Sequence, residues 1–282
     1  MSTPPILETR RLWRLASQLL TSNQACRELP ELVTAVQLPV TTGRRIAVTS
    51  VQGGAGTSTV AALLALVYTA RRVDAVLAAD ADPEGGALAG RLGRSGTGTM
   101  ATLAPRLLAA QGADLRELGQ LLPRTATGLW VLPGGAPGQP RLARDVTRVL
   151  SRLFMICVTD CGQGNSQATR EVLAEAHAVV VVTPSTPDGL RVTCAALDRV
   201  AGGDRAASLS RVVIALVRSN TDALRDASAR GVSARYGVPV VTIPHDRHLT
   251  TVAAITPSQV GAQTLVETTR LAALAWARAR AL

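Results

Sequence analysis

The stretch "VTSVQGGAGTSTVAALLALVY", residues 48–68, decides the fold. It reads as the end of a buried strand, a glycine-rich turn and then a helix rich in alanine and leucine. Gly53, Gly54 and Gly56 let the backbone curl so that several N–H groups point at one anion, and the N-terminus of the helix adds its partial positive charge. The spacing therefore suits a phosphate group. No lysine follows the third glycine, where such a loop needs one to neutralise the phosphate.

The composition limits the chemistry that the chain can perform. All thirty basic residues are arginine and the net charge is +10, so Schiff-base catalysis and a lysine phosphate clamp are excluded. The positive net charge favours nucleic acid, anionic lipid or an acidic protein as a partner. The alternative is that the charge only keeps the protein surface soluble. Aromatic residues, at 2%, are too few to stack single-stranded nucleic acid.

The cysteines and the apolar runs point to a cytoplasmic protein. The cysteines lack the paired close spacing of a zinc site and are interpreted as reduced thiols; they are Cys26, Cys157, Cys161 and Cys194. We find neither a signal peptide nor an apolar run of about eighteen residues that could span a bilayer. The sequence therefore predicts a soluble, cytoplasmic chain.

Short β-branched runs alternate with alanine- and leucine-rich helical runs over residues 43–282. The predicted strands are "RRIAVTSV", "VDAVLAAD", "LWVLP", "FMICVTD", "AVVVVTP", "RVVIALV" and "VPVVTIP". Continuous apolar strands between helices predict a doubly wound α/β domain with a mostly parallel sheet. Residues 1–42 form an N-terminal helical extension, with helices over 6–20 and around 27–37, the second interrupted by Pro30. We expect its apolar face to pack on the main domain, with partner docking as the alternative.

Acidic residues lie where two of these strands end. Asp80 is followed by "ADPEGG", and the strand "FMICVTD" ends in Asp160, followed by "CGQG". Ligands of an open parallel sheet bind beyond the carboxyl ends of its strands, and carboxylates there can hold Mg²⁺ and the attacking water of phosphoryl transfer. The structural alternative for Asp160 is that it caps the turn after its strand.

At this point the sequence resembles a known family. "QGGAGTST", residues 52–59, is similar to the deviant Walker A motif K-G-G-x-G-K-[ST]-[ST] of the MinD/ParA P-loop ATPases. "DADPEGG" resembles their switch I, "TDCGQG" their switch II, and "IPHDRHL" the segment beside the adenine. The resemblance covers residues 43–282 and is closest to MinD-like proteins of actinobacterial type VII (ESX) secretion loci, through "VTDCG" and "VVVTPSTPDG".

The resemblance implies ATP and Mg²⁺ as cofactors. The residues that it assigns to nucleotide binding are Gly53, Gly54, Ala55, Gly56, Thr57, Ser58, Thr59, Asn220 and Pro244. It further assigns Mg²⁺ binding to Ser58 and Asp160, and catalytic or switch roles to Asp80, Asp82 and Asp160. A purely structural role is an equal alternative for Asn220, because its side chain can stabilise a turn. The same alternative applies to Pro244.

Both lysines of the family motif are absent, and their positions are Gln52 and Thr57. Thr57 can donate one neutral hydrogen bond, but it cannot neutralise a polyphosphate, and efficient hydrolysis needs that charge. The alternative is rescue by an arginine from a later loop, or by one from a partner chain. The candidates in this chain are Arg191, Arg218 and Arg247.

These observations predict a weak or non-hydrolysing nucleotide-binding component of an assembly or regulatory system, plausibly type VII secretion. Its partners would be secretion-system proteins and a second copy of the chain. One alternative is an active ATPase whose dimerisation is switched by ATP, and another is a partition-type protein that binds DNA non-specifically. Membrane contact is peripheral at most, because the alanine-rich residues 262–282 suit packing against the sheet better than insertion in lipid.

Overall fold

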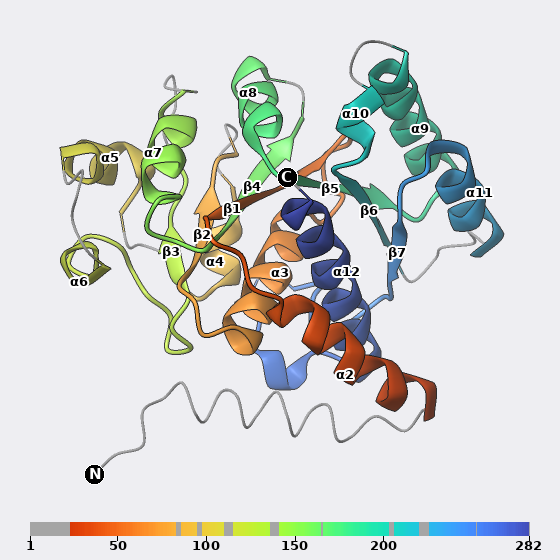
Figure 1. Ribbon diagram of the computed structural model, residues 1–282, viewed down its shortest axis with the longest axis horizontal. Coiled ribbons are helices and arrows are strands. Elements are labelled where there is room, and N and C mark those ends of the chain that lie inside the picture. The colour runs from red at the N-terminus through yellow and green to blue at the C-terminus, as the bar shows by residue number, and fades with distance from the viewer. Residues whose placement is uncertain are drawn as a thin grey trace.

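The computed structural model places a seven-stranded sheet at the centre of the chain (Figure 1). It describes residues 23–82, 86–94, 98–109, 115–135, 141–164, 166–202, 206–219, 226–251 and 253–281. The helix predicted over 6–20 and the predicted base contact Asn220 lie outside these residues, as does part of "DADPEGG".

The strands pair in the order β3-β2-β4-β1-β5-β6-β7, and every one of these pairs is parallel. They are β1 (Arg44–Ser50), β2 (Val76–Asp80), β3 (Trp130–Leu132), β4 (Ile156–Gln163), β5 (Ala178–Pro184), β6 (Val212–Val217) and β7 (Val240–Ile243). The seven predicted runs are therefore confirmed as strands. The chain order reverses direction across the sheet beside β1, which puts the loop after β1 at a topological switch point.

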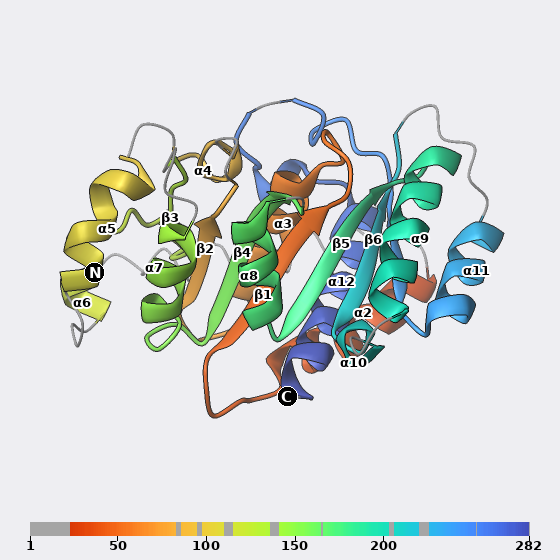
Figure 2. The ribbon, with the colours of Figure 1, turned by 90° about the horizontal axis from the view of Figure 1, so that it is seen from above.

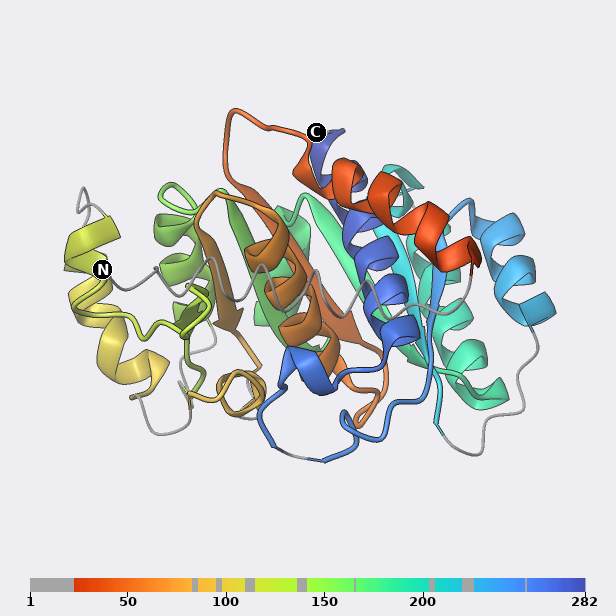
Figure 3. The ribbon, with the colours of Figure 1, turned by 90° about the horizontal axis from the view of Figure 1, so that it is seen from below.

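Helices cover both faces of the sheet, as a doubly wound fold requires. They are α2 (Asn23–Gln37), α3 (Thr57–Arg71), α4 (Leu88–Arg91), α5 (Met100–Ala109), α6 (Leu115–Leu118), α7 (Leu142–Leu150), α8 (Gln167–Glu175), α9 (Pro187–Ala201), α10 (Ala206–Leu209), α11 (Asp226–Tyr236) and α12 (Ala262–Arg280), with a 3₁₀ turn η1 (Pro257–Gln259). Figure 2 shows α7, α8 and α9 over one face, and Figure 3 shows α3 and α12 over the other with α2 outside them.

The last helix is part of the core. Leu271 and Trp276 of α12 are completely buried and belong to the same apolar cluster as the inward residues of β1 and β5. The prediction that this segment packs against the sheet is confirmed. Among the described residues, none of the helices combines the length and the apolarity needed to cross a membrane.

Helix α2 is docked on this core through a buried cation. The Arg72 guanidinium lies 4.4 Å from the centroid of the Trp276 ring and donates hydrogen bonds to the carbonyls of Val36 and Leu38, at 2.6 and 3.0 Å. Trp276 Nε1 donates to the same Leu38 carbonyl at 2.9 Å. The expectation that the extension packs on the main domain is thus confirmed for α2.

The prediction that Pro30 interrupts that helix needs correction. In the described residues α2 runs from Asn23 to Gln37 without a break, and Pro30 lies inside it. A proline within a helix removes one backbone hydrogen bond and costs about 3 kcal/mol. The packing of α2 on α12 and the anchoring of its end by Arg72 offset that loss.

Candidate functional site

The loop between β1 and α3 has the backbone geometry of an anion cradle. Gly54 and Gly56 adopt φ values of 72° and 93°, in the left-handed region that favours glycine. The Ser50 hydroxyl donates to the Gln52 carbonyl at 2.8 Å and closes the start of the loop. The N-cap residue of α3 is Gly56, which has no side chain to cap the first N–H groups of the helix. A methyl group built on Gly54 or Gly56 meets no atom of the described residues within 4 Å.

The two positions where a lysine is missing differ in their surroundings. Thr57, the first residue of α3, is buried at 9% exposure. The Gln52 Nε2 donates to Asp188 Oδ2 of α9 at 3.0 Å. Asp188 also pairs with Arg191 on the next turn of that helix, at 2.6 Å. Neither substituted side chain therefore places a positive charge in the loop.

Two carboxylates meet beside this loop at the carboxyl ends of β2 and β4. Asp80 and Asp160 are partners in the register of these strands and are 1% and 0% exposed. The Asp82 N–H donates to Asp80 Oδ1 at 3.2 Å, and the Ser58 hydroxyl, at the start of α3, lowers the pKa of the Asp160 carboxyl group. A side chain on Gly162 would overlap the Asp82 carboxylate. The predicted acidic residues and the predicted hydroxyl ligand therefore form one cluster.

The end of β4 lies further along the chain than the sequence predicted. The strand was expected to end at Asp160, but it continues to Gln163. Its register with β1 shifts after the pair of Val48 and Asp160, and pairing resumes at Ser50 and Gln163. Such a bulge accommodates extra residues without ending the ladder. As a result Asp160 lies inside the strand with its carboxylate fixed.

Burial raises the pKa of both carboxyl groups. The pKa of Asp80 rises to about 7, first because of its burial and second because of repulsion from Asp160. Burial raises the pKa of Asp160 to about 6, although the nearby Ser58 hydroxyl acts in the opposite direction. Within the described part of the chain, the Oδ2 atoms of both residues are buried without a hydrogen-bond partner. Two unpaired carboxylate oxygens side by side are a costly arrangement unless a cation or protons join them.

These oxygens fit Mg²⁺. Mg²⁺ takes oxygen ligands, usually one or two carboxylates together with water and substrate phosphates. Asp160 and Ser58 supply such oxygens next to the phosphate loop. The described residues contain no group of three or more histidine, cysteine, aspartate or glutamate side chains arranged to hold a metal on its own. The site therefore suits a Mg²⁺ ion shared with a nucleotide better than a metal bound by protein alone.

The Asp160 oxygen Oδ1 also serves the local backbone. It accepts the Gly162 N–H at 3.1 Å, which is the turn-stabilising contact that the sequence offered as an alternative role. The two roles are compatible, since the second oxygen of the same carboxylate has no such partner.

An open hollow lies between the end of β7 and the start of α12. It measures about 720 Å³, and Pro244, the predicted base contact, lines it. Asp246 shapes its floor by accepting the N–H groups of His248 and Gly261, at 3.0 and 2.7 Å. Figures 2 and 3 both show the chain after β7 passing beside the loop after β1. The volume falls within the range of small-molecule sites.

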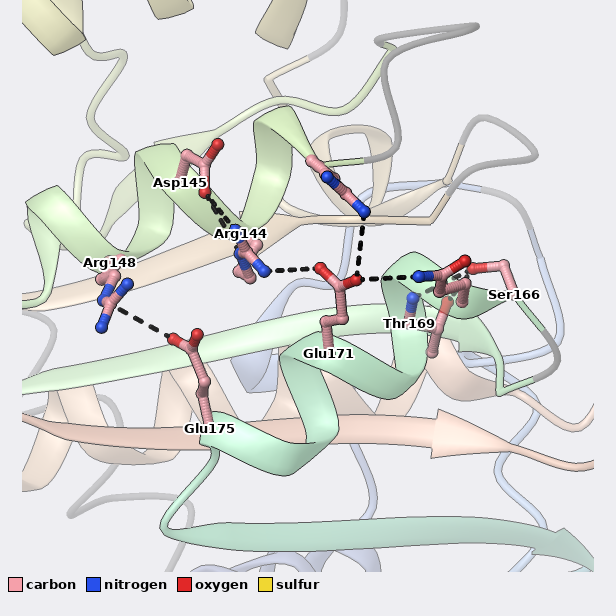
Figure 4. A network of polar contacts seen from close by, with 9 residues as sticks. Arg144, Asp145, Arg148, Ser166, Thr169, Glu171 and Glu175 are labelled. Carbon is pink, nitrogen blue, oxygen red and sulfur yellow. Dashed lines mark hydrogen bonds and ion pairs between the residues drawn. The ribbon is translucent and has the colours of Figure 1, made fainter.

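Ion pairs connect the helix that follows the Asp160 segment to its neighbour (Figure 4). Arg144 of α7 pairs with Glu171 of α8 at 2.5 Å, and Arg148 pairs with Glu175 at 3.9 Å. Ser166 caps α8 by accepting the Thr169 N–H. Helix α8 is therefore held at a defined place after β4.

Sequence reasoning missed several residues that shape the site. Gln163 places its amide over the loop, so that a side chain on Gly53 would come within 2.8 Å of its Nε2. Gly134, after β3, leaves room for the Asp80 carboxylate, because a side chain there would lie 2.8 Å from Asp80 Cγ. Asp188 was not considered either, although "TPDG" directly after a predicted strand is a signal for the start of a helix.

Comparisons with known proteins agree with this arrangement. The structure is similar to that of a ParA family ATPase from Chlorobium tepidum TLS, with a TM-score of 0.65 and 20% identity over 81% of this chain and 98% of that one. It is also similar to the septum site-determining protein MinD of Pyrococcus horikoshii OT3 in complex with Mg-ADP, with a TM-score of 0.59 and 22% identity over 81% of this chain and 95% of that one. The chain has the MinD/ParA fold.

Sequence comparison finds a further similarity. The chain is 32% identical over 216 residues to the ESX-1 secretion-associated protein EspI of Mycobacterium tuberculosis (strain CDC 1551 / Oshkosh). The match covers 73% of this chain but only 32% of EspI, so the chain spans about a third of the length of that relative. No protein-family model matches the sequence.

Proposed function

We propose that the chain is a nucleotide-binding component of MinD/ParA type with a degenerate Walker A motif, which binds ATP weakly and hydrolyses it slowly or not at all. One observation carries this proposal. The loop after β1 keeps its open backbone cradle beside two buried carboxylates with unpaired oxygens, while both lysine positions lack a positive charge.

Each part of the site has a role in this proposal. The N–H groups of the loop and of the first turn of α3 bind the phosphates through backbone geometry. Ser58 and Asp160 hold Mg²⁺, which when bound neutralises phosphate charge. Asp80 and Asp82 orient water near the last phosphate, and Pro244 borders the base. A lysine would stabilise the charge that develops in the transition state, so its loss reduces hydrolysis more than binding.

The similarity to EspI supports a place in type VII secretion. EspI is described as secretion-associated, and the chain shares 32% identity with it over 216 residues. We propose that the chain acts in the cytoplasm as an assembly or regulatory component, with secretion proteins as partners and with a homodimer as its nucleotide-bound state. In this proposal residues 43–282 form the nucleotide-binding domain, and residues 1–42 form an extension that is docked through α2.

Calorimetric titration with ATP and Mg²⁺ tests the proposal. The wild type should bind weakly, and Thr57→Lys should tighten Kd by about tenfold or more, because a charged hydrogen bond contributes about 1.5–3 kcal/mol. Thr69→Lys is a matched control, since it adds the same charge near the far end of the same helix. Absence of binding by both the wild type and Thr57→Lys would contradict the proposal. Rapid ATP turnover by the wild type that Asp160→Ala abolishes would contradict its non-hydrolysing part.

A further inference from the structure

A single carboxylate connects the phosphate loop to an arginine. Asp188, the second residue of α9, accepts a hydrogen bond from Gln52 Nε2 through Oδ2, at 3.0 Å. Its other oxygen, Oδ1, accepts two hydrogen bonds from Arg191, at 3.1 Å from Nε and at 2.6 Å from Nη2. A guanidinium is therefore held beside the first of the two positions where the chain lacks a lysine.

The fold fixes the place of this carboxylate. Strand β5, which leads into α9, pairs directly with β1, which leads into the phosphate loop. Thr186 caps α9 by accepting the Gly189 N–H at 3.0 Å, and a side chain on Gly189 would come within 2.5 Å of the Pro184 carbonyl. The hydroxyls of Thr183 and Thr193 join the strand to the helix at 3.0 Å in the core. The start of α9 is thus anchored at the same edge of the sheet as the loop.

The pair of Asp188 and Arg191 is accessible to a ligand. The two side chains are 61% and 72% exposed, and ion pairs this exposed are held weakly. The pKa of Asp188 is lowered by the Arg191 and Gln52 hydrogen bonds, so the carboxylate is fully charged at neutral pH. A polyphosphate carries several negative charges and accepts the planar guanidinium in a bidentate manner, and it can therefore compete for Arg191.

Three other arginines near the phosphate loop or the hollow after β7 make different contacts. Arg45, at the start of β1, donates to the Glu175 carbonyl at the opposite edge of the sheet. Arg72, just after α3, is buried and anchors α2. Arg247 directs its Nε to His248 beside the hollow after β7. The contacts of Asp188, in contrast, bring Arg191 to the loop itself.

We propose that Arg191 supplies the positive charge that the phosphate loop lacks. When a nucleoside polyphosphate binds over the loop, the guanidinium moves from Asp188 to the phosphate oxygens, while Gln52 keeps its hydrogen bond to Asp188. Arg191 is then a binding residue, and Asp188 is a positioning residue that holds the guanidinium ready and competes with the ligand for it. This inference rests on the proposed function, because it assigns a cation to the same nucleotide site.

Asp188 and the ligand compete for Arg191 in this proposal. The competition predicts effects on binding that a purely structural ion pair would not produce. Calorimetry measures Kd for ATP with Mg²⁺, and in parallel for inorganic pyrophosphate with Mg²⁺. Arg191→Gln should raise Kd for both ligands by about fivefold or more, and Arg191→Lys should recover part of the lost affinity. Asp188→Asn should lower Kd for both ligands by about twofold or more, since it releases Arg191. Arg199→Gln is the matched control on the same helix, because the Arg199 Nε donates to the Ala195 carbonyl of its own turn, and it should leave Kd unchanged.

Melting temperatures of all variants confirm that they are folded. Two outcomes overturn the inference while leaving the proposed function intact. In the first, the wild type binds and Arg191→Gln binds equally well. In the second, Arg191→Gln and Asp188→Asn both weaken binding, as expected of an ion pair that merely supports the helix. If the wild type, Asp188→Asn and Thr57→Lys all fail to bind ATP and pyrophosphate, the proposed function fails as well, and the inference fails with it. If Thr57→Lys alone binds, only the inference fails.

Discussion

The buried pair of Asp80 and Asp160 makes a quantitative prediction about stability in the absence of Mg²⁺. Replacing Asp80 with asparagine keeps the shape of the side chain and removes its charge. The new amide can donate to the neighbouring Asp160 carboxylate, whose Oδ2 lacks a partner in the described structure. We expect Asp80→Asn to stabilise the protein at pH 8 and to have little effect at pH 4.5.

The sign and size follow from the pKa of Asp80, which is raised from 3.8 to about 7. At pH values between 3.8 and about 7, Asp80 retains its proton in the folded chain and has released it in the unfolded chain. The free energy of unfolding therefore decreases as the pH rises from about 4 to about 7, and the loss is complete above pH 7. One pKa unit corresponds to about 1.4 kcal/mol, so the shift is worth about 4 kcal/mol at pH 8. Asp160, with a pKa raised to about 6, adds a contribution of the same sign.

Urea unfolding in EDTA at pH 4.5, 6 and 8 measures this effect. The wild type should lose stability across the series, and Asp80→Asn should recover much of the loss at pH 8. Asp145→Asn is the control, because Asp145 is half exposed in a surface ion pair and should not reproduce the gain. If Asp80→Asn destabilises the protein equally at pH 4.5 and pH 8, the reasoning about a buried charge is refuted.

Three further predictions concern the loop, the far edge of the sheet and the docked helix. Gly56→Ala should lower stability by about 1–2 kcal/mol in thermal melts, because φ at this position is 93°, whereas Gly231→Ala in helix α11 should not. Burial lowers the pKa of His177 to about 4, so the contribution of His177 to stability should fall as the pH drops from about 6.5 to 4, and the urea midpoint of the wild type should fall relative to that of His177→Asn over this range. Arg72→Leu leaves the carbonyls of Val36 and Leu38 without their donor and should cost about 3 kcal/mol, with faster proteolysis of α2; unchanged proteolysis would contradict this role.

The strands and the acidic cluster could be predicted because their signals are local. Each strand is a continuous apolar run, and parallel connectivity places the carboxyl ends of such runs at one edge. Asp80, Asp82, Asp160 and Ser58 therefore came together as the sequence predicted.

The parts that could not be predicted depend on contacts between distant segments. Pro30 remains inside α2 because that helix packs on α12, which lies more than two hundred residues away. The extension of β4 to Gln163 results from its bulged pairing with β1. Asp188 reaches Gln52 only because β5 and β1 are neighbours in the sheet. No local pattern encodes such pairings.

We propose that the backbone of the loop after β1 binds phosphate without a lysine. The most direct measurement is an NMR titration of the labelled protein with ATP and Mg²⁺, followed through the backbone amide signals. We predict that the signals of Gly54, Gly56 and the first turn of α3 shift progressively as ATP is added, and that Asp160→Asn reduces the shifts. Amide signals of this loop that stay unchanged at millimolar ATP, or shifts confined to other parts of the chain, would contradict the claim.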